Sequence, residues 1–248
     1  MEFRLLRADE IDVRVSQIAS NYCTLLLYKD ARVDQNILDE TVGCMNWQKR
    51  YVRDNANCIV GIWDEEKKQW VEKEDTGTES FSEAEKGLAS DSFKRACFNW
   101  GIGRELYTAP SIFIFPRKDM GAKTKEDEES KEFYKVGEVN GKDKYATKTK
   151  FYVDLIDYDK NRNIKDLVIR DNKGNLRFEL LTKEKEKELN KQFDELIKLI
   201  ETNEDKDENF DREKFYSYFN VSSNLQLNFK QRTEAISLLE ERLKKAGK

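Results

Sequence analysis

The sequence predicts an α+β fold in which an antiparallel β-meander packs on one long helix, a β-β-β-α core, with a helical C-terminal region after it. Three stretches, 46–53, 57–63 and 69–77, are rich in strand-forming residues and are separated by short polar turns. The stretch 82–100 then has apolar residues at the spacing of one helix face, namely Ala89, Phe93, Ala96, Cys97 and Trp100. Apolar residues return at helical spacing after residue 182.

Further elements are expected before the meander. Residues 9–19 fit either a short helix or a strand, because their apolar residues alternate. Residues 22–28 are predicted to form a buried strand. Residues 34–42 have one apolar helical face and are followed by Gly43, a residue that commonly ends helices. In the long helix, Ser82 is the expected N-cap.

Beyond the long helix we expect a strand at 111–115 and a second small meander that extends the same sheet. The strands of this second meander are predicted at 150–158, 164–170 and 176–180. The chain is therefore divided into three parts: a core of residues 1–180 with a charged mobile loop at about 117–148, a helix with an acidic hinge at 181–204, and a small helical module at 205–248.

Composition limits the possible functions. The 248 residues have a formal net charge of −4, so any nucleic-acid site must be a local basic strip on an acidic protein. No apolar run approaches the ~18 residues of a membrane span, and the first residues lack an apolar signal-peptide region. We therefore expect an intracellular protein without a membrane partner. The four cysteines, expected to be buried free thiols, are Cys23, Cys44, Cys58 and Cys97.

The chain contains no histidine, which excludes Ser-His-Asp and Cys-His catalysis. No Gly-Lys-Ser or Gly-Lys-Thr phosphate loop is present, so no nucleotide cofactor is expected. A carboxylate-metal nuclease built on Asp54, Asp64 and Glu66 remains an alternative, although the last two lie in a predicted hairpin turn. We expect a protein that is not an enzyme and needs no cofactor or metal.

The long helix holds an adjacent basic pair, Lys94 and Arg95. Lys86 lies on the same polar ridge as Lys94, and Asp91 stands one turn before Arg95, where it could orient the guanidinium. Solvated surface charge is the alternative interpretation. Short residues near the pair would let a ligand or another backbone approach the helix; these are Ala89, Ser90 and Ser92.

A second basic group alternates with aromatic residues, a combination typical of proteins that bind single strands by phosphate contacts and base stacking. Its cations are Lys29, Arg32, Lys49, Arg50 and Arg53, and its aromatic residues are Tyr28, Trp47 and Tyr51. The alternative is that the aromatic side chains are core and the cations are exposed strand ends.

The ordered combination of these motifs resembles the Rad fifty-two family of single-strand annealing proteins, in particular its phage and prophage branch. The resemblance covers roughly residues 5–115. Its motifs are Asn46-Trp47, the meander, Glu74-Asp75-Thr76-Gly77, the run Ser90-Asp91-Ser92-Phe93-Lys94-Arg95-Ala96, and Trp100-Gly101. It implies rings or helical homo-oligomers that hold single-stranded DNA in a groove and anneal it without ATP, in recombination and repair in the cytoplasm of a bacterial host.

The resemblance also implies roles for particular residues. Lys94 and Arg95 match the pair that grips the inner phosphate backbone, and Arg32 matches a basic residue at the groove. The family often has another Arg where this chain has Phe98, so this phosphate contact is either missing or supplied elsewhere, with Arg104 as the candidate. A structural oligomer without DNA binding is the remaining alternative. For the C-terminal module we expect a protein contact, for which the host single-strand-binding protein is a candidate.

Overall fold

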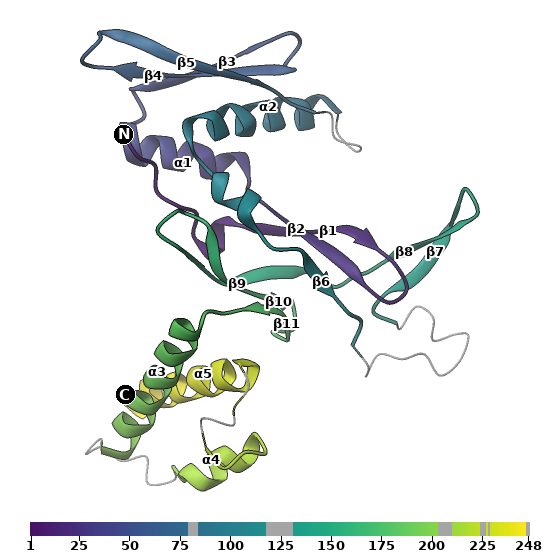
Figure 1. Cartoon of the computed structure of the whole chain (residues 1–248), viewed down its shortest axis with the longest axis vertical. Coiled ribbons are helices and arrows are strands. Elements are labelled where there is room, and N and C mark those ends of the chain that lie inside the picture. Colours follow the sequence, from purple (N-terminus) through teal and green to yellow (C-terminus); the bar gives the residue numbers. More distant parts are fainter. Residues whose placement is uncertain (79–83, 118–130, 203–209, 224–226, 228, 247–248) are drawn as a thin grey trace.

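The computed structural model describes residues 1–78, 84–117, 131–202, 210–223, 227 and 229–246. Its elements are stacked along the long axis of the molecule (Figure 1). From one end to the other, Figure 1 shows a three-stranded sheet, a layer of two helices, a six-stranded sheet and the C-terminal helices. The mixed α+β fold predicted from the sequence is confirmed, with antiparallel sheets and helices at the C-terminal end.

The three-stranded sheet is the predicted meander. Its strands pair antiparallel in the order β3-β4-β5, and the long helix α2 packs against one face. Apolar side chains of the central strand alternate toward this helix, so that Cys58, Val60 and Ile62 are buried with Phe93 and Cys97. The bounds are β3 Trp47–Val52, β4 Asn57–Asp64, β5 Gln69–Thr76 and α2 Ala84–Trp100.

The six-stranded sheet has the order β11-β10-β9-β1-β2-β6. Here the stretch that fitted either a helix or a strand is a strand, β1, preceded by the single 3-10 turn η1. The prediction that the second meander extends the first sheet is wrong. Its strand β9 pairs with β1, with Asp12 opposite Tyr152. The bounds are η1 Ala8–Glu10, β1 Asp12–Ile18, β2 Cys23–Tyr28, β6 Ile112–Ile114, β9 Phe151–Tyr158, β10 Ile164–Asp171 and β11 Leu176–Leu180.

Helix α1, Ala31–Val42, lies beside α2 between the two sheets (Figure 1). The carboxylate of Asp30 caps its first turn by accepting a hydrogen bond from the backbone N–H of Arg32 at 2.8 Å. The predicted end is confirmed, because Gly43 adopts φ 84° directly after the helix. The helix begins earlier than predicted since this cap precedes its apolar face.

Part of the segment expected as a charged loop is ordered as a hairpin. Strands β7, Tyr134–Val139, and β8, Lys142–Ala146, pair antiparallel around a turn at Asn140-Gly141, a dipeptide typical of two-residue hairpin turns. The hairpin extends from the six-stranded sheet (Figure 1). Residues 118–130 of the expected loop lie outside the described part of the chain.

The C-terminal helices have an apolar core of their own. Helix α3, Lys183–Thr202, contributes Phe193 and Ile197, which pack with Tyr216 from α4, Arg212–Tyr218, and Leu239 from α5, Phe229–Ala246. The boundary expected at residue 205 therefore divides one packed unit, since α3 shares this core. The expected acidic hinge lies largely at 203–209, outside the described residues.

Two further predictions concern the cysteines and membrane-spanning segments. Three of the cysteines, Cys23, Cys58 and Cys97, are buried free thiols as predicted, whereas Cys44 is exposed. Within the described ranges, no helix is long and apolar enough to cross a bilayer.

Candidate nucleic-acid interface

A groove runs between α2 and the six-stranded sheet, with a volume of about 720 Å³. One wall comes from α2 and from the 3-10 turn η2, Arg104–Thr108. The facing wall comes from β1, β2 and β6. We call this feature the α2 groove; its charged and aromatic lining residues are Arg14, Tyr28, Lys29, Asp91, Lys94, Arg95, Phe98, Tyr107 and Phe113.

Close backbone contact with the meander holds α2 in place. A Cβ atom on Gly77 would stand 2.5 Å from the backbone nitrogen of Ser92, so only glycine fits this approach. The buried hydroxyl of Ser92 donates to the backbone carbonyl of Asn55 at 3.1 Å. Ser92 is one of the short residues near the basic pair, and the backbone of Gly77 approaches the helix at this residue.

At the other end of the helix, aromatic and cationic side chains hold α2 to the meander. The indole N–H of Trp100 donates to the carbonyl of Val60 at 3.0 Å, and the ammonium of Lys73 lies 4.4 Å from the Trp100 ring centroid. Two positive-φ glycines, Gly101 and Gly103, then turn the chain into η2. These contacts fix the helical wall of the groove.

Lys94 and Arg95 both line the α2 groove. The guanidinium of Arg95 remains half exposed and pairs with Asp75 on β5, with Nε 3.3 Å from Oδ1. The carboxylate predicted to orient Arg95, that of Asp91, accepts instead from the backbone N–H of Thr78 at 2.9 Å and from its hydroxyl at 3.1 Å. Arg95 is therefore oriented by the strand, because β5 runs beside the helix.

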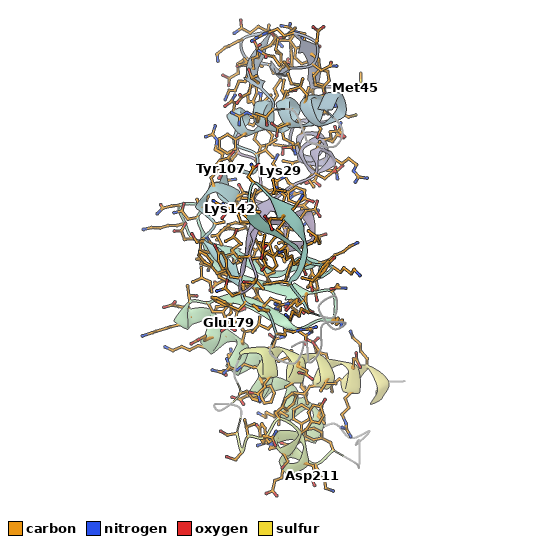
Figure 2. All side chains as sticks on the ribbon, turned by 90° about the vertical axis from the view of Figure 1, so that its right-hand side faces the viewer. Lys29, Met45, Tyr107, Lys142, Glu179 and Asp211 are labelled. Carbon is orange, nitrogen blue, oxygen red and sulfur yellow. The ribbon has the colours of Figure 1, made fainter. Side chains whose placement is uncertain are left out.

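Lys29 lies at the floor of the groove and is buried. Its ammonium forms an ion pair with Asp34 of α1, which is fully buried. The stem of Lys29 crosses Gly103, where a Cβ atom would stand 2.3 Å from Lys29 Cε. Figure 2 shows Lys29 and Tyr107 at the same height, below α2 and at the upper edge of the six-stranded sheet.

Desolvation shifts the titration of Asp34. Burial raises the pKa of this carboxyl to about 6, and the positive charges of Lys29 and Lys94 oppose the shift. The Oδ2 atom of Asp34 has no hydrogen-bond partner among the described residues. Lys29, predicted as a DNA contact, is thus committed to neutralising an internal carboxylate.

Arg32, the second predicted groove residue, is an exposed side chain on the first turn of α1. Its Nε donates to Asp30 Oδ1 at 2.8 Å. The charge of Lys94 reaches the same carboxylate and helps to lower the pKa of Asp30, after the larger contribution of the hydrogen bonds from Arg32. Arg32 therefore stands near Lys94 outside the lining of the groove.

The remaining cations of the second basic group lie on the meander with Trp47 and Tyr51, away from the groove lining, whereas Tyr28 lines the groove. Trp47 packs on Phe93 with ring centroids 6.2 Å apart, and the Lys49 ammonium lies 4.3 Å from the centroid of the same ring. Arg50 pairs with Glu72 at 2.8 Å. Arg53 occupies the β3–β4 turn with φ 53°. The structure thus separates these meander residues from the groove that Lys94 and Arg95 line, because α2 lies between the meander and the six-stranded sheet (Figure 1).

Phe98 and Arg104 contact each other at the C-terminal end of α2. Arg104 caps the end of α2 by donating from Nε to the Phe98 carbonyl and from Nη2 to the Asn99 carbonyl, both at 2.8 Å. Its guanidinium lies 5.6 Å from the ring centroid of Phe98. The Phe98 ring in turn meets Tyr107, with centroids 4.8 Å apart. An aromatic pair therefore occupies the place of the expected cation.

Several lining residues were not predicted from the sequence. Arg14 lies opposite Leu26 on the open face of the sheet, and its guanidinium lies 5.8 Å from the Tyr28 ring centroid. Strand alternation with Val13 and Val15 is a signal that could have placed Arg14 on this face. Phe113 has the same signal, since it alternates with Ile112 and Ile114 on β6. Tyr107 has no comparable signal, because the fold alone brings η2 to the groove.

The remaining predicted site features are Lys86, the Ser82 cap and the candidate metal ligands. The side chain of Lys86 and the proposed Ser82 cap lie outside the described residues. Asp64, one of the candidate metal ligands, accepts hydrogen bonds from the backbone N–H groups of Glu66 and Lys67 at 3.1 and 3.0 Å. The part of the chain that the structure describes contains no group of three or more Cys, Asp or Glu placed to hold a metal ion.

The groove thus combines two cations on a helix with an aromatic lining that spans the helix, the 3-10 turn and the sheet. Such a surface suits a phosphate chain whose bases are free to stack. Comparisons with protein-family models, with curated proteins and with solved structures found no match to this chain.

Proposed function

We propose that the protein binds single-stranded DNA in the α2 groove and anneals complementary strands without ATP, in homologous recombination and DNA repair. The observation that supports the proposal most is the lining of that groove: Lys94 and Arg95 stand beside the exposed rings of Tyr28, Tyr107 and Phe113. Cationic grooves with stacking platforms are the usual construction of single-strand binders. The resemblance to the Rad fifty-two family motivates the annealing step.

The charge distribution suits this role. The chain as a whole has net charge −4, so phosphate is attracted to a local site and repelled by the acidic remainder. Lys94 and Arg95 stand on neighbouring positions of a helix that is held firmly to the meander. Both cations are therefore presented from a backbone whose position is already fixed by the fold. No covalent bond is made or broken in annealing, which agrees with a chain that has no histidine.

A fluorescence assay tests the proposal directly. Two complementary labelled oligonucleotides are mixed with the full-length protein in the absence of nucleotide, and the rate of duplex formation is recorded. The wild type should accelerate annealing, and Lys94→Ala combined with Arg95→Ala should abolish most of the acceleration. A matched control, Lys187→Ala with Lys191→Ala, removes two exposed lysines from α3 and should leave the rate unchanged. Equal loss in both double variants, or no acceleration by the wild type, contradicts the proposal.

We further propose that the working form is a homo-oligomer. Strands β3 and β5 are the outer strands of the described three-stranded sheet, and outer strands are surfaces on which another chain can pair. Light scattering coupled to size-exclusion chromatography, with and without a long single strand, tests this. A monomer under both conditions contradicts it.

For the C-terminal helices we propose a protein contact, with the host single-strand-binding protein as the candidate partner. The support is their separate apolar core, which leaves the α2 groove to DNA. The location that accompanies these proposals is the cytoplasm of a bacterial cell.

A further inference from the structure

We propose that Phe98 and Tyr107 form a base-stacking site that makes binding depend on the bases of the nucleic acid as well as on its phosphates. The inference rests on the proposed function and deepens it, because it states what the α2 groove recognises. The occupant is an unstacked base of a single strand whose phosphate is held by Lys94 and Arg95.

The first argument is exposure. Tyr107 leaves 76% of its surface open to solvent although it lines a groove. Across the groove, Phe113 is 48% exposed and Leu26 is 43% exposed. Apolar surface gathered in a concave site is seldom left uncovered in a soluble protein, and it marks the place where a ligand is bound.

The second argument is the spacing along α2. Phe98 follows Lys94 by one helical turn, so that their side chains are neighbours about 5–6 Å apart on the helix surface. A nucleotide has the same order of dimension, since one sugar separates its phosphate from its base. A phosphate held at Lys94 therefore brings the attached base to Phe98. Tyr107 extends this platform, with its ring centroid 4.8 Å from that of Phe98.

The third argument is charge. Arg104 lies 5.6 Å from the Phe98 ring centroid and is fixed there by two hydrogen bonds to the end of α2. It therefore lies over the Phe98 ring and helps to hold that ring in place, and the open surface of the aromatic pair belongs mainly to Tyr107. The cations on the groove wall attract a polyanion, and the aromatic pair beside them accepts its apolar part. Duplex DNA lacks unstacked bases and cannot use the second feature.

The proposal predicts which probes are bound. The full-length protein is titrated with a thymine strand, with a strand of equal length that lacks bases but has the same phosphates, and with duplex. The wild type should bind the thymine strand about tenfold more tightly than the baseless strand at equal salt. Tyr107→Leu should remove most of this difference and leave binding of the baseless strand unchanged. The salt dependence should not change, because no charge is lost.

Controls separate the two proposals. Tyr218→Leu removes another exposed tyrosine with an adjacent ring, 4.9 Å from Phe219 in the C-terminal unit, and should bind like the wild type. Phe98→Leu should reproduce the effect of Tyr107→Leu. If Phe98→Leu unfolds the protein, Tyr107→Leu still tests the proposal, because the Tyr107 side chain is exposed and its loss leaves the fold intact. Equal affinity of the wild type for both strands overturns the stacking site but leaves the proposed function standing. No binding of either strand overturns both.

Discussion

Lys29 and Asp34 form an ion pair inside the protein at the floor of the α2 groove, where their side chains are 7% and 0% exposed. Removing one member of a buried pair leaves the other charge unpaired, which usually costs about 3–5 kcal/mol. Lys29→Met should therefore lower the free energy of unfolding by roughly 3 kcal/mol in urea titrations. Adding Asp34→Asn should recover part of this loss, because both charges are then gone. If the double variant loses the sum of the free energies of unfolding lost by the two single variants, the ion pair is contradicted.

The same pair predicts a pH dependence of stability. Burial raises the pKa of Asp34 from 3.8 to about 6, while Lys29 and Lys94 lower it and Asp30 raises it slightly. Between these two values the folded protein holds a proton that the unfolded chain has released. The free energy of unfolding should therefore fall as pH rises through this window, by up to ~3 kcal/mol, and this contribution should be constant above it.

The measurement compares unfolding of the wild type and of Asp34→Asn across that pH range. The advantage of the wild type should shrink as pH rises toward the folded pKa, since Asn does not titrate. A difference that is constant, or that grows with pH, contradicts the predicted shift. The carboxyl carbon resonance of Asp34 gives the titration midpoint independently.

Gly77 should be indispensable for the position of α2. Its missing Cβ would stand 2.5 Å from the Ser92 nitrogen and 2.6 Å from the Leu88 carbonyl oxygen, both backbone atoms that cannot rotate away. Gly77→Ala should destabilise the protein by about 1–3 kcal/mol. Gly137→Ala is the matched control, since nothing lies within 4 Å of its added Cβ. If thermal unfolding shows equal effects of both changes, α2 does not approach the meander as described.

Salt dependence should report the phosphate contacts of the basic pair. For single strands each lost phosphate contact lowers the slope of log affinity against log salt by about 0.7. Lys94→Ala with Arg95→Ala should therefore reduce the slope by about 1.4 in anisotropy titrations. Lys49→Ala with Arg50→Ala provides the comparison, because both residues lie on the meander outside the groove lining. An equal reduction in this second variant would place phosphates on the meander as well.

Truncation after Thr182 should remove the C-terminal helices as one unit, because α3 shares their apolar core. The shortened protein should anneal naked strands as the full chain does. It should anneal strands coated with single-strand-binding protein more slowly, if that protein is the partner. Equal rates on coated strands would contradict the proposed contact. Truncation at residue 205 is a poorer experiment, since it exposes Phe193 and Ile197 of α3.

The sequence by itself determined the local elements. Alternating residues predicted β3, a mostly apolar run predicted β4, and a polar turn between two such stretches predicted β5. Helical spacing from Ala89 to Trp100 predicted α2, because side chains at this period face one core. The turn at Asn140-Gly141 was also predictable, since few residues adopt positive φ. These features depend on neighbours in the chain, and their signals are therefore local.

Only the tertiary structure decided which of these elements meet. Pairing of β1 with β9 joins residues far apart in the chain, and periodicity does not encode the partner of a strand. Lys29 and Lys49 are both cations next to aromatic residues, yet one is buried against Asp34 and the other lies over Phe93 across α2. Tyr107 reaches the groove because Gly101 and Gly103 turn the chain after α2. Packing between distant elements set these environments, and environment decides whether a charge or a ring is available to a ligand.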